Sequence, residues 1–157
     1  MAKIVIAQQF CGPPNSGNGG YVCGVLARDI EGPVTSVLRA RVPLDVDLHL
    51  NLMGGVMLMT DAEGGLVGRG EGADRGLLPT PPAPPSLEAA RAAGERCLGL
   101  EQRIHPICFT CGPERQEGDG LRVFAGQVEG APDGHVACVG KRRTRRLPTL
   151  KALSRPR

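Results

Sequence analysis

The sequence contains very few aromatic side chains: of its 157 residues none is tryptophan, one is tyrosine and three are phenylalanine. Proteins that bind single-stranded nucleic acid stack its bases on aromatic side chains. The shortage therefore argues against a nucleic-acid-binding surface. Long hydrophobic runs are also missing, because no apolar stretch approaches the roughly 18 residues of a membrane-spanning helix. We expect neither nucleic acid nor a membrane as a partner.

A secretory signal is lacking as well. Residues 1–7, MAKIVIA, have one charge and an apolar core that is too short for a signal peptide. We therefore expect a cytoplasmic protein. In that compartment the six cysteines indicate reduced thiols or metal ligands rather than disulfides.

Acidic residues are absent from the C-terminal end. Residues 141–157 carry eight basic residues, which leaves eleven basic against sixteen acidic residues in 1–140. The body is therefore mildly acidic, although the whole chain has a formal net charge of +3. The tail has too little apolar surface to offset the entropy of ordering it, so we expect residues 141–157 to be disordered. The alternative is a tail that binds nucleic acid or anionic lipid.

One helical pattern followed by several strand patterns occupies the first half of the chain. Val22, Val25 and Leu26 share one face and predict a helix over residues 20–29. Leu48, Leu50 and Leu52 alternate with polar residues, as in a strand with one buried side. A helix followed by an antiparallel meander is typical of the α+β class. The expected strands are residues 34–42, 47–52, 56–59 and 66–70, after a short β-like run at 3–10.

A proline-rich stretch, residues 79–85, predicts a stiff spacer between two units. Ser86 is a good N-cap for an alanine-rich helix over residues 87–98. Further strands are expected at residues 121–124 and 135–139. The predicted organisation is a first unit at 1–78, a linker and helix at 79–104, an incomplete second unit at 105–140 and the basic tail at 141–157.

Four glycines in nine residues precede the first predicted helix, from Gly12 to Gly20, and Asn18 is a good N-cap residue. No Lys follows as in a phosphate-binding loop, and the glycines do not form the dinucleotide-binding pattern GxGxxG. Unpaired amides of Gly19, Gly20 and Tyr21 at a helix start would stabilise a carbonyl oxygen that gains negative charge. The alternative is a tight turn that needs positive φ angles.

Two stretches carry a resemblance to a known family. NSGNGGYVCGVLA, residues 15–27, and the strands after it resemble the hot-dog fold of acyl-CoA thioesterases, in which an antiparallel sheet wraps a central helix. CFTCGPERQEGDGLRVF, residues 108–124, is similar to the opening strand of single-domain relatives, with Arg115 where Asn is frequent. The resemblance therefore implies a double hot-dog protein whose second repeat is incomplete.

The same resemblance implies where a substrate would bind. In the family, the carbonyl of an acyl thioester meets backbone amides at the helix start. By this resemblance, the residues that match the catalytic positions of the family are Asn18, Gly19 and Gly20. Those expected to bind the substrate are Asn15, Tyr21, Cys23 and Gly24. Small side chains at Cys23 and Gly24 would line an apolar slot, and a glycine inside a helix hints at a close neighbour.

One departure from the family concerns the carboxylate that many members carry on the helix about two turns after Gly-Gly. Ala27 occupies that position here, and Asp29 falls on a different side of the helix. Catalysis by the usual carboxylate is therefore not expected.

Cysteines and a histidine offer a competing chemistry. Cys97, His105, Cys108 and Cys111 supply four soft ligands, and CxxC is half of a common zinc site. A second CxxC or an HxxxH is missing, so small buried thiols are the alternative reading.

The sequence thus predicts a thioesterase-like protein that binds or hydrolyses acyl-CoA or a related acyl thioester, without a cofactor or a metal. We also expect a homo-oligomer, because a single hot-dog sheet leaves an unpaired edge. The alternative is a non-catalytic interaction protein, or a small zinc-binding module with a basic nucleic-acid-binding tail.

Overall fold

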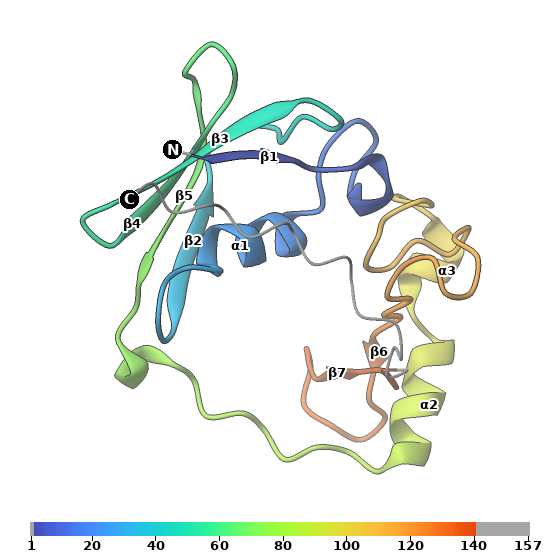
Figure 1. Ribbon diagram of the computed structural model, residues 1–157. Coiled ribbons are helices and arrows are strands. Elements are labelled where there is room, and N and C mark those ends of the chain that lie inside the picture. The colour runs from blue at the N-terminus through green and yellow to red at the C-terminus, as the bar shows by residue number, and fades with distance from the viewer. Residues whose placement is uncertain (1, 141–157) are drawn as a thin grey trace.

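A computed structural model describes residues 2–140 of the chain. The expected disordered tail, residues 141–157, lies outside the described residues. We call the elements before the proline-rich stretch at 79–85 the first unit and those after it the second unit (Figure 1). The predicted division of the chain at 1–78, 79–104 and 105–140 stays a prediction. The elements of the first unit are β1 (Ala2–Val5), η1 (Gln8–Phe10), α1 (Gly19–Ala27), β2 (Val34–Leu38), β3 (Asp47–Met53), β4 (Val56–Thr60), β5 (Leu66–Gly72) and η2 (Arg75–Leu77). Those of the second are α2 (Leu87–Glu95), α3 (Leu98–Gln102), β6 (Gly126–Gln127) and β7 (Val136–Ala137).

The first unit is an antiparallel sheet with a helix packed on it. Its five strands lie in the order β1-β3-β4-β5-β2, and every neighbouring pair is antiparallel. Helix α1 packs against β2, β4 and β5 (Figure 1). The predicted α+β class, with a helix on an antiparallel sheet, is therefore confirmed. The arrangement is compatible with hot-dog topology.

The core lies between α1 and the sheet. Leu48, Leu50, Met57 and Met59 point from β3 and β4 toward the helix side, as the period of two predicts. They meet the apolar face of α1, which consists of Val22, Val25 and Leu26. Two glycines of β5 let the helix approach the sheet closely. A Cβ atom on Gly70 would lie 3.0 Å from the carbonyl oxygen of Leu26, and one on Gly68 would lie 3.2 Å from Leu26 Cδ1.

Several element boundaries differ from the sequence prediction. Helix α1 begins and ends slightly earlier than residues 20–29, and β2 ends at Leu38 instead of residue 42. The amides of Arg39 and Ala40 both donate hydrogen bonds to the carbonyl oxygen of Val67. Because two consecutive residues share one acceptor, the regular pairing of β2 with β5 ends there. The β-like run at 3–10 splits into β1, which pairs with β3, and the short helix η1.

The second unit is small and is built around α2, which packs against β6 and β7. Ser86 caps α2, as predicted, by accepting a hydrogen bond from the Ala89 amide (3.1 Å). The expected strand at 121–124 does not form, because Arg122 has a φ of 52°, a left-handed value that an extended strand excludes. The assignment of 105–140 as an incomplete hot-dog repeat stays a prediction.

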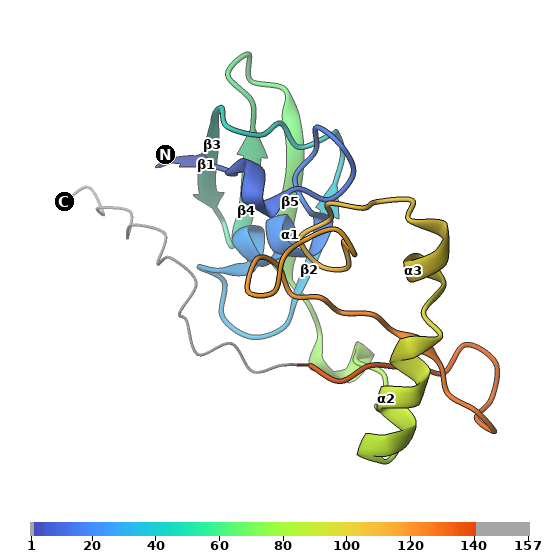
Figure 2. The same ribbon diagram turned by 90° about the vertical axis from the view of Figure 1, so that its right-hand side faces the viewer.

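The segment that connects α3 to β6 returns to the first unit. Its Phe109 joins the core of that unit and donates its amide to the carbonyl oxygen of Cys11 (2.7 Å). Figure 2 shows this segment lying against the start of α1. The two units therefore meet at the glycine-rich loop.

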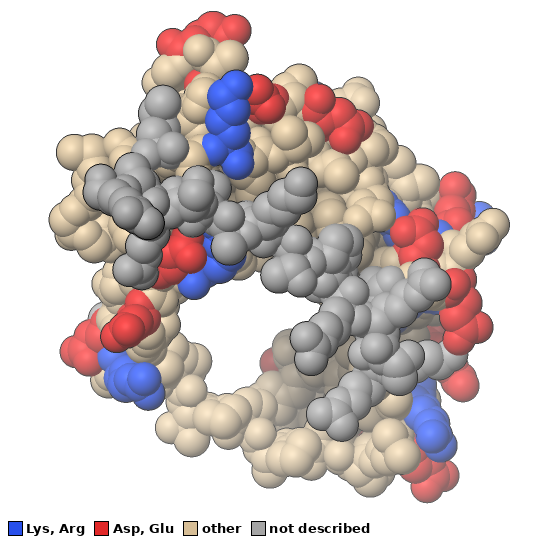
Figure 3. Space-filling view, viewed as in Figure 1, with Lys and Arg blue, Asp and Glu red and all other residues tan. Residues whose placement is uncertain are grey.

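Opposite charges lie side by side on the surface of the first unit (Figure 3). Lys3 pairs with Asp47 at 2.8 Å, Arg28 pairs with Asp29 at 3.2 Å, and Arg69 pairs with Glu71. Within residues 2–140, no helix has both the length and the apolar character that a membrane crossing requires.

Candidate functional site

The start of α1 is held in place by Asn18 and the residue before it. The Oδ1 atom of Asn18 accepts a hydrogen bond from the Tyr21 amide (3.0 Å), which confirms the predicted N-cap. Backbone bonds fix the approach to the helix: the Asn18 amide donates to Phe10 (2.7 Å) and the Gly17 amide donates to Val42 (2.9 Å). A Cβ atom on Gly17 would lie 3.0–3.2 Å from three core side chains, so this position is packed too closely for a larger residue.

Two of the three amides predicted for the site remain unpaired. Within the described part of the chain, no acceptor bonds the amide of Gly19 or that of Gly20. The Tyr21 amide, in contrast, donates its hydrogen bond to Asn18 Oδ1. Gly20 is exposed and Gly19 is half-buried. Both amides lie in the first turn of a helix, where the dipole attracts negative charge.

Tyr21 belongs to an aromatic cluster. Its ring stacks on Phe10 with centroids 3.9 Å apart, and Phe109 meets both rings edge-on. Burial raises the pKa of the Tyr21 hydroxyl above its usual value, and nearby Arg28 opposes this shift. Asn15 lies in the exposed part of the loop with a φ of 61°.

The other two predicted substrate contacts lie further along α1. Cys23 is half-buried beside β2, where its carbonyl oxygen accepts a bond from the Ser36 hydroxyl (3.3 Å), and burial raises the pKa of its thiol. Gly24 is exposed, and a Cβ atom there would meet no described atom within 4 Å other than those of its chain neighbours and its own helix backbone. The predicted close neighbour of Gly24 is therefore absent from the described chain. Gly20 and Gly24 are four residues apart and form a bare strip on one side of the helix.

Ala27 stands on α1 where the thioesterases that residues 15–27 resemble often carry a carboxylate. Ala27 is the last residue of α1 and is half-buried. Asp29 lies beyond the helix and pairs with Arg28 at 3.2 Å.

Cys108 approaches Asn18 from the second half of the chain, a contact that sequence reasoning missed. Its sulfur lies 3.5 Å from Asn18 Nδ2, which donates to it, and both residues are buried. The CxxC motif was visible in the sequence. Nothing in the sequence indicated that Asn18, 90 residues away, is the partner of Cys108.

Arg115 holds the segment that carries Cys108. Only 8% of its side chain is exposed. The guanidinium donates to the carbonyl oxygen of Ile107 (2.7 Å), to Asp119 (2.9 Å) and to the Cys11 sulfur (3.2 Å). The residue noted as a departure from the family pattern is therefore the centre of the local hydrogen bonding.

The two cysteines of the CxxC motif have opposite pKa shifts. Burial alone would raise the pKa of Cys108, but hydrogen bonds from the amides of Cys111 and Thr110, the Cys111 thiol and Asn18 together lower it. Burial and the neighbouring Cys108 raise the pKa of Cys111 to about 11.

The residues considered for zinc do not form a metal site. Among residues 2–140, no three His, Cys, Asp or Glu side chains are gathered as metal ligands. His105 is exposed, while Cys108 is buried.

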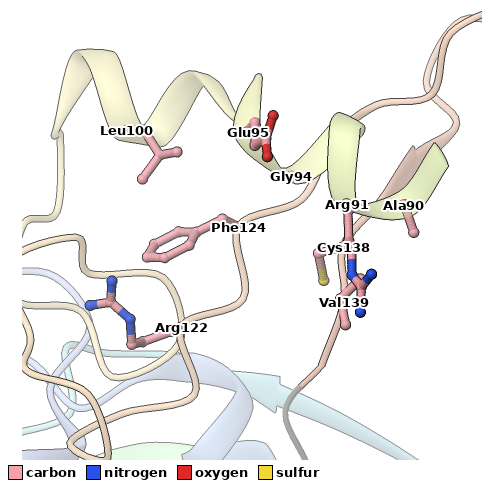
Figure 4. Close-up of a pocket in the computed structure, with 9 residues that line it drawn as sticks. All are labelled: Ala90, Arg91, Gly94, Glu95, Leu100, Arg122, Phe124, Cys138 and Val139. Atoms are coloured by element: carbon pink, nitrogen blue, oxygen red, sulfur yellow. The ribbon is translucent and has the colours of Figure 1, made fainter. Parts of the chain in front are cut away.

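A cavity of about 310 Å³ lies away from the start of α1, between α2 and the irregular segment that contains Arg122 and Phe124 (Figure 4). Phe124 and Leu100 point into it, and Arg122 lies 5.0 Å from the centre of the Phe124 ring. A second cavity of about 320 Å³ lies between the proline-rich linker and β7. Neither is lined by a predicted site residue.

Comparison with models of known protein families, with curated proteins and with solved structures gave no match.

Removal of the Asn18 side chain provides a test of this geometry. We expect Asn18→Ala to lower the free energy of unfolding by about 1 kcal/mol or more, because the Tyr21 amide loses its cap. Asn18→Ser keeps a capping oxygen but has no amide to donate to Cys108, so it should recover most of the loss. Chemical denaturation of the three proteins measures the difference. Equal stability of Asn18→Ala and the wild type would contradict the capping role.

Proposed function

We propose that this chain is a thioesterase-like protein of the hot-dog type that binds or hydrolyses acyl-CoA or a related acyl thioester at the start of α1. The observation that carries the proposal is the pair of unpaired amides at Gly19 and Gly20, in the first turn of a helix that lies on an antiparallel sheet. The resemblance of residues 15–27 to the thioesterase family supports the same location.

The chemistry follows from what two amides can do. The carbonyl oxygen of a thioester gains negative charge when water attacks its carbon, and donors already aimed at that oxygen stabilise the transition state. Collapse of the intermediate then releases the thiol and the carboxylic acid. Asn18 serves as a positioning residue, because its cap fixes the backbone that presents both amides.

The acyl chain would lie along the bare strip at Gly20 and Gly24. Both are exposed and present no side chain, so an extended chain can approach the helix backbone there. A half-buried Cys23 borders the strip. With Ala27 in place of a carboxylate, the attacking water has no base from that position, and we expect slow turnover.

The direct experiment uses the full-length protein and acyl-CoA thioesters of increasing chain length. Release of CoA is followed by chromatography, because the six cysteines of the protein would react in a thiol-trapping assay. Binding is measured in parallel by calorimetry. We expect at least one thioester to be bound or hydrolysed. Neither binding nor hydrolysis of any member would overturn the proposal.

Self-association is expected because β1 and β2 are the edges of the sheet. Unpaired edge strands present backbone groups that a second copy can bond. Val5 in β1 is 43% exposed, so Val5→Lys should weaken association through that edge. Leu98→Lys, at a 65% exposed position in α3, is the matched control and should change nothing. Sedimentation velocity at micromolar concentration measures all three proteins, and a monomeric wild type would contradict this expectation.

A further inference from the structure

Cys108 and Cys111 lie on one turn of the chain. The carbonyl oxygen of Cys108 accepts a hydrogen bond from the Gly112 amide (2.8 Å), which closes a single turn of helical type over residues 108–112, with both cysteines in it. By helical geometry, Cα atoms three residues apart in such a turn lie about 5 Å from each other. A disulfide joins Cα atoms about 4.4–6.8 Å apart. The side chains of Cys108 and Cys111 are close enough to influence each other's pKa across this turn.

The surroundings of Cys108 favour negative charge on its sulfur. Asn18 Nδ2 donates to it at 3.5 Å from a fixed N-cap position, and the backbone of Thr110 and Cys111 in the turn contributes to the lowered pKa of its thiol. The Asn18 donor stays in place whether the sulfur is protonated or not, because Asn18 is held by its own bond to Tyr21. Hydrogen bonds to a thiolate are charge-assisted and hence stronger than those to a thiol.

We propose that Cys108 and Cys111 are a redox-active dithiol that a small hydroperoxide oxidises to an intramolecular disulfide, with Cys108 as the attacking sulfur and Cys111 as the resolving sulfur. The proposal does not depend on the proposed acyl-thioester site.

The reaction balances in two steps. The Cys108 thiol first loses its proton to solvent, and the thiolate attacks the distal oxygen of the hydroperoxide. The O–O bond breaks, Cys108 becomes a sulfenic acid, and the departing hydroxide or alkoxide takes up a proton from solvent and leaves as water or an alcohol. The Cys111 sulfur then attacks the Cys108 sulfur and displaces its hydroxyl group, which leaves as water with the Cys111 proton. Two thiols lose two electrons, and the hydroperoxide gains them. A dithiol reductant returns the pair to its thiol form.

Burial of the pair decides the class of oxidant. Cys108 is 5% exposed, so a bulky disulfide cannot reach its sulfur in the folded chain, whereas hydrogen peroxide is close to water in size. Cys111 is half-buried and lies nearer to solvent. The lowered pKa of Cys108 and the raised pKa of Cys111 agree with this division of roles.

The wild-type protein offers a direct test because trypsin cleaves after Arg103 and Arg115. The peptide between these sites, residues 104–115, contains Cys108 and Cys111 and no other cysteine. The reduced full-length protein is treated with hydrogen peroxide, the remaining thiols are alkylated, and the digest is weighed by mass spectrometry. We expect this peptide to appear without alkyl groups and lighter by two hydrogens, and to regain both thiols after reduction. Its oxidation should be faster than that of Cys23, since the pKa of Cys108 is lowered and that of Cys23 is raised, and the thiolate is the form that reacts.

Single variants separate the two roles. In Cys111→Ser, Cys108 should stop at the sulfenic acid, which dimedone traps on the same peptide. In Cys108→Ser, oxidation of Cys111 should be lost. Cys138→Ser, which removes a half-buried cysteine of the second unit, is the control and should leave the disulfide unchanged. The proposal is overturned if Cys108 and Cys111 both remain alkylatable after Cys23 has been oxidised. It is equally overturned if Cys111 is oxidised at the wild-type rate without Cys108.

Discussion

Replacement of Leu26 by alanine is expected to lower the free energy of unfolding by about 2–5 kcal/mol. Leu26 is fully buried, and it lies where α1 meets β5: its carbonyl oxygen and side chain lie directly over Gly70 and Gly68. The glycines provide no side chain that could move into the space, so the cavity left by the substitution stays open. For a chain of this length, the melting temperature should fall by about 2–4 °C for each kcal/mol.

Leu52→Ala is the matched control for this prediction, because it is the same chemical change at a residue that is 47% exposed. A change within about 0.5 kcal/mol is expected there. Thermal and chemical denaturation of both variants measure the difference. Similar losses at Leu26 and Leu52 would mean that α1 does not pack on the sheet as described.

The first unit could be predicted from the sequence because its signals are local. Alternation in β3 gives the buried face of that strand, and the spacing of Val22, Val25 and Leu26 gives the buried face of α1. Asn18 is a cap residue by type, and the structure confirms it. Leu52 shows where the pattern ends: it continues the alternation of β3 but lies next to the hairpin turn and is exposed.

The contacts of the second half could not be predicted, because they depend on which distant segments meet. Phe109 was visible as an apolar residue, but nothing local indicates that it joins the core beside Phe10 and Tyr21. Arg115 was noted only as a departure from a family pattern, yet it bonds three groups, one of them Cys11. The apolar residues around Arg122 predicted a strand there, but its left-handed backbone excludes one.

Asn18 connects the two proposals, since its two side-chain atoms face different partners. Oδ1 caps the helix whose amides would bind a thioester, and Nδ2 donates to the sulfur that would be oxidised. Oxidation of Cys108 removes the charge that this donor favours but leaves the cap intact. The redox state of the cysteines and the acyl-thioester site can therefore be tested independently in the same protein.

Gly19→Pro is expected to lower the rate of thioester hydrolysis by about 10²–10³-fold, which corresponds to about 2.7–4 kcal/mol in the transition state. Proline removes the amide hydrogen that the proposed site requires and places a ring carbon where that hydrogen was. The fold should tolerate it. Gly19 is the first residue of α1, a position that proline favours, and Asn18 before it has the extended backbone (φ −64°, ψ 125°) that proline demands of its predecessor. The Gly19 amide bonds no acceptor among the described residues, so its removal costs the folded chain no hydrogen bond.

Gly19→Ala separates the amide from the added bulk, because it keeps the N–H group and adds a methyl group whose nearest neighbour, Leu38 Cδ1, is 3.8 Å away. It should hydrolyse the responding thioester at close to the wild-type rate and be at least as stable, since alanine is the better helix former. Circular dichroism and melting curves establish that both variants are folded before their rates are compared. If folded Gly19→Pro is as active as the wild type, the carbonyl oxygen is stabilised elsewhere, and the unpaired amides of this loop belong to the turn alone. A loss in Gly19→Pro that Gly19→Ala does not share, at equal stability, is the result that only a donor at Gly19 explains.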